Sequence, residues 1–430
     1  IKNSFLIPPL LDKRGHFVVD DSNGISLSIA VSLLNSKNNY ILVTSNLYKA
    51  QKLYNTLTTF LPDESILLFP NDELIRAETI AQSKELVAQR LYVLNELINN
   101  KVRVVITNVA SATRYLPSPD TFKNNSFNFK VGNSYDLVEI KKQLVKAGYL
   151  LVNKVDQSLQ FAVRGDILDI YSVNNDNPVR IEFFGDEIES IRFFDIAKQV
   201  SIKNVNSVSI LPACDFILTD LEKEKAMDKI LDVLEKDQAI HDLGTFQTLR
   251  NLVVSDIESI LEGSPDPKFY KYYSLISESK NSIFDYCPNF TRVLVDYDSL
   301  ENSNKILQDE SWQYLNELSE NGRIITHLEL YQNLFNLVNK NLANTVYTSS
   351  FIETALDPVI NVKSVPFKAN KNTDAINIIQ NYLNDGFTVI INSSSHNNIN
   401  LIGSREKLIG INLENSINCL IEINQNIIAV

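Results

Sequence analysis

Short apolar runs alternate with amphipathic stretches over the first 117 residues of the chain. The runs typical of buried strands are residues 40–44, 66–69 and 101–107. Residues 47–60 and 83–99 instead repeat apolar side chains at helical spacing. Strands that alternate with helices predict a parallel sheet with covering helices. We therefore expect an α/β domain over residues 1–117, ending at the break Leu116-Pro117-Ser118-Pro119.

The pattern changes between residues 118 and 206, where helical spacing is confined to residues 137–147. Alternation with the strand period of two is seen in residues 165–171 and 179–184. A third strand is predicted after a turn, at residues 188–194. Residues 174–178 connect the first two of these as a hairpin loop. This segment predicts a small α+β module built on an antiparallel sheet.

Two further segments complete the chain. Residues 207–340 are mainly helical in pattern and include one buried strand, Arg292–Asp296. Residues 341–430 return to strand and helix alternation. Their predicted elements are strands near 345–348, 388–391 and 426–430 and a helix over 374–383. We expect the first and third segments to form one α/β domain that the module interrupts, and the fourth to form a small α/β domain.

Composition narrows the classes of function. A chain of 430 residues suggests roughly two to four domains. Its net charge of −12 argues against a dedicated non-specific DNA binder, which normally presents a basic face. The three cysteines and four histidines are isolated, so no disulfide framework or metal site is predicted. No apolar run has membrane-spanning length and no secretory signal is visible, so we expect a cytoplasmic protein without a membrane partner. Because the chain begins with Ile, we expect a fragment.

One stretch of the module is specific enough to indicate a family. Residues 161–171 (FAVRGDILDIY), followed by residues 180–192 (RIEFFGDEIESIR), closely resemble domain 2 of the bacterial transcription-repair coupling factor (Mfd) family. That family shares this domain with UvrB, a helicase subunit of excision repair. Further matches in the same order are Leu67–Pro70, Glu85–Leu91, Leu211–Ala213, Asp285–Pro288 and Val293–Asp296. The resemblance covers at least residues 5–300 and is weaker beyond them.

The resemblance implies a domain plan. Residues 1–117 and 207–340 correspond to the two parts of a degenerate RecA-like domain, derived from a P-loop fold. Residues 118–206 correspond to the UvrA-binding domain 2. Residues 341–430 correspond to the small α/β domain 3 of the family.

A working nucleotide site is not expected in this chain. A P-loop needs a lysine for the β and γ phosphates and a Ser or Thr for magnesium. Gly24-Ile25-Ser26 stand where Gly-Lys-Ser/Thr would, so Ile25 occupies the lysine position. Asp296-Tyr297 likewise replaces the Asp-Glu pair of a helicase. We therefore predict no catalytic residues, ATP or magnesium here, and expect both cofactors only at a C-terminal motor beyond this chain.

A partner site is expected instead. The residues through which the family contacts UvrA are two arginines and a phenylalanine on the domain 2 sheet, and they fall on Arg164, Arg180 and Phe184. The arginine fork suits interface hot spots, because it pairs with carboxylates and stacks on rings. Strand alternation puts Arg180 and Phe184 on one face and Phe183 on the other, so Phe183 is the better core candidate. From the residues alone, Arg180 would more often be a solvated or salt-bridged strand residue, and Phe184 could equally be a core residue.

The chain departs from the family pattern at one point near this site. Where the family usually has Gly-Glu-Phe before Ala-Val-Arg, this sequence has Leu159-Gln160-Phe161. The backbone at the start of that strand, and any contact that the glutamate makes, are therefore open questions here.

Taken together, the residues and the resemblance predict an adaptor that recruits UvrA to stalled RNA polymerase in transcription-coupled nucleotide excision repair. The resemblance implies that RNA polymerase and DNA are bound by C-terminal domains, and that the motor covers domain 2 in the resting full-length protein. One alternative is a UvrB-type, DNA-bound helicase subunit. It is disfavoured by Ile25 and by the short stretch between Pro70 and Glu85, which leaves no room for UvrB's DNA-clamping hairpin. A structural brace for the motor is the other alternative.

Overall fold

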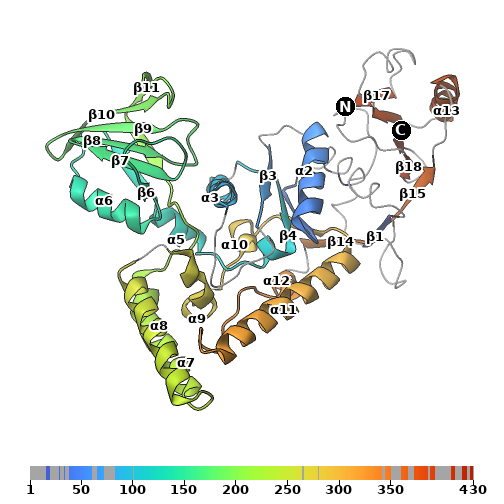
Figure 1. Cartoon of the computed structure of the whole chain (residues 1–430). Coiled ribbons are helices and arrows are strands. Elements are labelled where there is room, and N and C mark those ends of the chain that lie inside the picture. Colours follow the sequence, from blue (N-terminus) through green and yellow to red (C-terminus); the bar gives the residue numbers. More distant parts are fainter. Residues whose placement is uncertain are drawn as a thin grey trace.

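The computed structural model shows a central sheet, an antiparallel module beside it and a helical part that extends away from both (Figure 1). It describes residues 16–19, 29, 33, 38–60, 65–71, 83–99, 101–263, 266–278, 280–340, 344–349, 360–366, 372–385, 388–392, 408–411, 419–423 and 427–429.

The core of the central sheet is parallel. Its strands in spatial order are β3 (Ile66–Phe69), β4 (Val104–Asn108), β2 (Tyr40–Thr44), β13 (Thr291–Leu294), β14 (Thr345–Ser349) and β1 (His16–Val19). Each pairs in parallel with its neighbour. Strands β2 and β4 are buried along their whole length, which explains why their sequences are continuous apolar runs. The predicted strands at 40–44 and 66–69 are confirmed, and the one at 101–107 is observed as β4.

Helices cover this sheet as the sequence predicted. Helix α2 (Leu47–Phe60) packs on β3 and β4, and α3 (Lys84–Ile98) packs on β3. Helix α3 begins after Ser83, whose hydroxyl accepts a hydrogen bond from the Leu86 amide, as an N-cap residue does.

The first and third segments share one sheet. Strand β13 comes from the third segment, yet it lies between β2 and β14, with Val293 paired to Leu42 and Val346. The two segments therefore contribute strands to one sheet, although the module separates them in the sequence. A mixed α/β architecture follows, with a parallel sheet and a separate antiparallel one.

The fourth segment continues the central sheet. Its elements are β15 (Ile360–Pro366), α13 (Asn372–Asn384), β16 (Thr388–Asn392), β17 (Leu408–Ile411), β18 (Cys419–Ile423) and β19 (Ile427–Ala429). Strand β15 pairs in parallel with β1, which joins this group to the core. The sequence predicted a small α/β domain here; its strands and helix are observed, but they are hydrogen-bonded into the same eleven-stranded sheet of the described residues.

The module is an antiparallel sheet with one helix. Its strands in spatial order are β11 (Ser201–Val205), β10 (Glu187–Phe194), β9 (Val179–Phe184), β8 (Ile167–Tyr171), β7 (Gln160–Arg164) and β6 (Leu150–Leu151). All neighbours are antiparallel except β6 and β7. Helix α6 (Leu137–Lys146) buries Ile140 and Leu144 in the core that the inner face of this sheet also lines. A short second sheet pairs β5 (Phe127–Lys130) with β12 (Ser207–Ile210).

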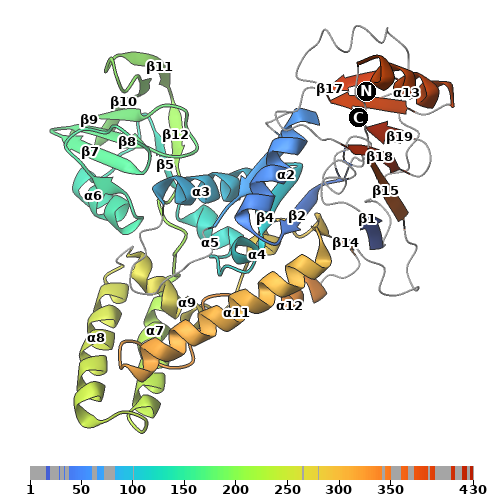
Figure 2. The ribbon, with the colours of Figure 1, turned by 45° about the vertical axis from the view of Figure 1, so that its right-hand side comes forward.

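The remaining part is helical. Its main elements are α7 (Asp220–Asp237), α8 (Leu243–Leu261), the 3-10 helix η3 (Pro267–Tyr272), α9 (Tyr273–Ile276), α11 (Tyr297–Glu320) and α12 (Leu334–Asn339). Both views show α7 and α8 side by side, pointing away from the sheets (Figures 1 and 2). The short helices are α4 (Val109–Ala112), α5 (Pro119–Asn124) and α10 (Ile283–Tyr286); α4 contacts β4 and α11, and both α5 and α10 contact α3. None of the helices in the described part of the chain has the length and apolar content of a membrane span.

Candidate functional site

Two arginines on the outer face of the module share one carboxylate. Strand pairing puts Asp169 on β8 directly opposite Arg180 on β9, and Arg164 lies at the end of the neighbouring β7. Oδ2 of Asp169 accepts hydrogen bonds from Nη2 of Arg164 and from Nη2 of Arg180, each at 2.8 Å, and its Oδ1 accepts from Nε of Arg180 at 2.7 Å. We call Arg164, Asp169 and Arg180 the open triad.

The members of the open triad differ in exposure. The side chain of Asp169 is 2% exposed, that of Arg180 is 15% and that of Arg164 is 51%. Burying a carboxylate is unfavourable unless charges and hydrogen bonds compensate it, and here two guanidinium groups do so. Among the described residues, nothing accepts a hydrogen bond from Nε or Nη1 of Arg164. The open triad therefore presents unused donors to solvent.

Arg180 is held on several sides. Its guanidinium carbon lies 4.5 Å from the centre of the Phe194 ring, within cation–π range. Oε1 of Gln199 accepts a further bond from Nη2 of Arg180 at 3.3 Å. The hydrogen bonds to Asp169 raise the pKa of Arg180 above its ordinary value. This guanidinium is therefore charged and fixed in orientation.

A second ion pair continues the outer face. Arg192 on β10 donates from both terminal nitrogens to the carboxylate of Glu182 on β9, and Ser190 donates to the same carboxylate at 2.8 Å. The hydrogen bonds from Arg192 lower the pKa of Glu182. The face thus carries three arginines and three carboxylates, because Glu187, which pairs with Phe184 across the strands, joins Asp169 and Glu182.

Phe184 stands at the rim of this surface. Its side chain is 82% exposed, whereas the adjacent Phe183 is 5% exposed and belongs to the core. The alternation predicted from the sequence is therefore confirmed. Gly165 and Gly185 open the two-residue loops beside it with φ of 58° and 61°, values that favour glycine.

All three predicted partner-binding residues lie in the described part of the chain and on this one face. The structure brings Arg164 and Arg180 together through Asp169, a contact that sequence reasoning did not predict. The residue stands in the motif that indicated the family, and strand alternation alone would have buried only its neighbours Leu168 and Ile170. The contacts of Asp169 depend on the cross-strand register, which cannot be derived from a single sequence.

A similar cluster lies inside the molecule. Arg90 on α3 donates to Oδ2 of Asp215 at 2.9 Å, and Arg114 donates to both oxygens of Asp215 at 3.0 and 3.1 Å. The guanidinium carbon of Arg114 also lies 4.0 Å from the centre of the Tyr270 ring. We call Arg90, Asp215 and Arg114 the closed triad, because its side chains are 1%, 5% and 1% exposed.

The closed triad ties three parts of the chain together. Arg90 belongs to α3, Arg114 follows α4, and Asp215 lies in the linker between β12 and α7. Burial by itself would raise the pKa of Asp215, but the charges of Arg114 and Arg90 lower it well below its usual range. This carboxylate is therefore ionised and locks the linker against the first segment.

An ion pair joins α2 to the residues that follow β13. Lys49 on α2 donates to Oδ2 of Asp296 at 3.0 Å, and the hydroxyl of Ser299 donates to the same oxygen at 2.6 Å. The amide of Asp296 donates to the Thr348 hydroxyl at 2.8 Å. The residues of the predicted degenerate nucleotide loop, Gly24, Ile25 and Ser26, lie outside the described residues.

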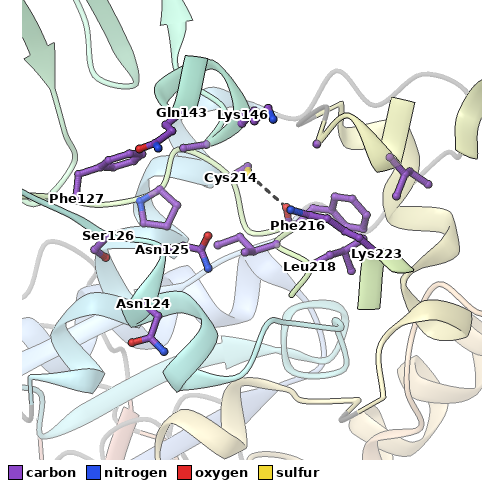
Figure 3. Close-up of a pocket in the computed structure, with 15 residues that line it drawn as sticks. Asn124, Asn125, Ser126, Phe127, Gln143, Lys146, Cys214, Phe216, Leu218 and Lys223 are labelled. Atoms are coloured by element: carbon purple, nitrogen blue, oxygen red, sulfur yellow. Dashed lines mark hydrogen bonds between the residues drawn. The ribbon is translucent and has the colours of Figure 1, made fainter. Parts of the chain in front are cut away.

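A cavity of about 360 Å³ lies where α5, α6, the linker and the α7–α8 pair meet (Figure 3). Its lining includes Lys146, Lys223 and Cys214, whose thiol donates to the carbonyl of Phe216 at 3.4 Å. Burial raises the pKa of the Cys214 thiol to about 12, so the thiol stays protonated at neutral pH and is a poor nucleophile. None of the predicted site residues lines this cavity. Over the part of the chain that the structure describes, no group of three or more His, Cys, Asp or Glu residues is placed to hold a metal ion.

The departure before β7 has a structural consequence. Leu159, where the family usually has glycine, adopts φ of 64°, a left-handed conformation that is strained for leucine. Its side chain is nevertheless buried. Gln160, in place of the family glutamate, is buried and its Oε1 accepts hydrogen bonds from the amides of Asp156 and Gln157 at 3.0 and 3.3 Å. Gln160 therefore fixes the loop before the strand.

Comparisons with known proteins match both the module and a longer stretch of the chain. Residues 127–216 match the family described as UvrB interaction domain. The transcription-repair-coupling factor of Bacillus subtilis is 33% identical over 354 residues, which cover 79% of this chain and 30% of that protein. Those of Staphylococcus epidermidis and Staphylococcus aureus are 26% identical, over 84% and 70% of this chain and 32% and 26% of their own lengths. The chain thus spans about a third of the length of these relatives or less, and it belongs to the transcription-repair coupling factor family, with its UvrB interaction domain at residues 127–216.

Proposed function

We propose that this chain is an adaptor that binds UvrA through the outer face of its UvrB interaction domain. The observation that carries the proposal is that Arg164, Arg180 and Phe184 gather on that face with donors and ring exposed. Such a surface fits recruitment of UvrA in transcription-coupled nucleotide excision repair. RNA polymerase and DNA would be engaged by other parts of the longer relatives.

The physical chemistry of the face suits a protein partner. An exposed phenylalanine beside fixed arginines combines an apolar anchor with directional donors, the composition of an interface hot spot. The three arginines are balanced by Asp169, Glu182 and Glu187, whereas a surface that binds a nucleic-acid backbone presents clustered Lys and Arg without such balance. The proposal therefore favours a protein surface over DNA.

The proposal also holds that the chain hydrolyses no ATP. Ile25 stands at the position of the P-loop lysine, and the carboxylate of Asp296 is already bound by Lys49 and Ser299. A titration with a fluorescent ATP analogue and magnesium tests this point. Saturable micromolar binding would favour the UvrB-type helicase reading instead.

The main experiment is a binding titration of the 430-residue chain against purified UvrA. The matched variant carries Arg164→Ala, Arg180→Ala and Phe184→Ala together, and circular dichroism checks its fold. We expect the variant to lose a few kcal/mol of binding free energy, as hot-spot truncations do. Unchanged binding by the variant would move the interface elsewhere. No binding by either protein would leave the structural brace as the better account.

A further inference from the structure

We propose that Asp169 is a positioning residue that holds Arg164 and Arg180 in the alignment that receives a carboxylate side chain of the partner. This inference rests on the proposed function and names the chemistry of the partner surface. Asp169 itself does not touch a partner, because its side chain is 2% exposed beneath the two guanidinium groups. It acts through the arginines that it bonds.

The hydrogen-bond pattern leaves a defined receptor. Asp169 occupies Nε and Nη2 of Arg180 and only Nη2 of Arg164. The fork of Arg164 therefore keeps Nε and Nη1 for another acceptor, on a side chain that is half exposed. A guanidinium offers donors and no acceptor. The edge of Arg164 that Asp169 does not occupy combines the second hydrogen of Nη2 with that of Nε or Nη1, and this parallel N–H pair matches a carboxylate bidentately. The complementary group is thus an Asp or Glu of the partner.

Asp169 lies where it can compensate the charge repulsion between the two arginines. Two guanidinium groups on neighbouring strands repel each other, so without a shared anion each would turn towards solvent. The buried carboxylate removes that repulsion and fixes both planes before a partner arrives. Preorganised donors bind more tightly because less side-chain entropy is lost on association.

This reading makes a prediction opposite to that of simple charge attraction. Asp169→Asn keeps the size of the side chain but removes a negative charge from a face that binds an acidic partner. If net charge governed binding, affinity for UvrA would rise. If positioning governs it, affinity falls, because the neutral amide no longer holds both guanidinium groups. We expect binding about tenfold or more weaker, mainly through faster dissociation.

The matched control is Asp166→Asn. Asp166 lies in the adjacent hairpin loop, is exposed, and its carboxylate makes no hydrogen bond or ion pair within the described part of the chain. This variant removes the same charge from the same edge without touching the arginines. We expect its affinity for UvrA to stay within about twofold of the unmodified chain.

The experiment measures UvrA association and dissociation rates for the unmodified chain, Asp169→Asn and Asp166→Asn, well below the melting temperature of each. Weaker binding by Asp169→Asn alone supports positioning. Equal or tighter binding by Asp169→Asn overturns it while leaving the adaptor proposal intact, and tighter binding by both variants would favour net charge. Equal weakening by both variants also overturns it, because Asp166 makes no bond to the arginines. The proposal would also be overturned if Asp169→Asn weakened the binding of duplex DNA but not the binding of UvrA. If the unmodified chain does not bind UvrA, the proposed function itself has failed.

A second variant keeps the idea testable if Asp169→Asn does not fold. Arg164→Lys retains the positive charge on an exposed position but lacks the planar fork that bonds Asp169 with one edge and a partner with another. We expect a similar loss of affinity, at least about fivefold, with an unchanged melting temperature. Full affinity in Arg164→Lys would contradict the bidentate receptor.

Discussion

The two Arg–Asp–Arg triads of this chain have the same chemistry and different surroundings. In the closed triad, Asp215 and its two arginines are at most 5% exposed. In the open triad, Asp169 is equally buried, yet Arg164 is 51% exposed. The difference teaches that a shared carboxylate makes a lock when both guanidinium groups are covered, and a receptor when one of them reaches solvent.

The comparison also separates two kinds of energetic consequence. A buried ion cluster stabilises the folded state no more than apolar packing of similar volume, because the cost of desolvating the charges offsets most of their attraction. Removing one partner is nevertheless strongly destabilising, since buried charges are left uncompensated. Loss of Asp215 should therefore act on folding, and loss of Asp169 mainly on binding.

The largest expected effect is that of Asp215→Asn. This change leaves Arg90 and Arg114 buried beside a neutral amide, so we expect the free energy of unfolding to fall by about 3 to 5 kcal/mol. Urea unfolding followed by circular dichroism measures it. At a temperature where the variant is still folded, its affinity for UvrA should match that of the unmodified chain. A loss below about 1 kcal/mol would show that the closed triad is not a lock.

The contribution of Asp215 should depend on pH in a defined window. Because the arginines lower the folded pKa of this carboxyl, its stabilisation is complete above the unfolded value of about 3.9 and is lost as the pH falls towards the folded pKa. The stability difference between the unmodified chain and Asp215→Asn should thus be constant above about pH 5 and shrink below about pH 4. Denaturant titrations of both proteins from pH 3 to pH 7, taken as roughly the span over which a carboxyl titrates, give the curve. A difference that grows on acidification would contradict the assignment.

The two faces of the module offer the next comparison. Phe183→Ala removes a 5% exposed core ring and should cost about 3 to 5 kcal/mol. Phe184→Ala removes a ring that is 82% exposed and should change stability by less than about 0.5 kcal/mol. Thermal melts of the two variants, compared with their UvrA affinities, test whether stability and binding divide between the faces. Similar losses of stability in the two variants would contradict the idea that one face serves stability and the other binding.

A smaller difference in stability concerns the strain before β7. Leu159→Ala loses the buried side chain and keeps the left-handed backbone, whereas Leu159→Gly loses the same side chain and relieves the strain. We therefore expect the glycine variant to be more stable than the alanine variant by about 1 kcal/mol. This order reverses the usual one, in which glycine is the less stable. Equal stability, or an alanine variant that is the more stable, would show that the φ of Leu159 carries no cost.

Much of the local structure could be predicted because local periodicity reports it. Continuous apolar runs predicted β2 and β3, helical spacing predicted α2 and α3, and alternation separated Phe183 from Phe184. The segment after residue 341 shows the limit of this approach. Its strand β14 and its helix α13 could be predicted, but not that its strands would continue the central sheet through the pairing of β15 with β1.

The sequence by itself determined which residues form strands and helices, the family of the chain, and the three candidate partner-binding residues. Only the tertiary structure decided which charges share a carboxylate. Asp169 meets Arg180 because of the β8–β9 register, and Asp215 meets Arg90 across 125 positions of the chain. The physical reason is that periodicity is a local property, whereas the pairing of buried charges depends on how distant elements pack and on whether water still reaches them.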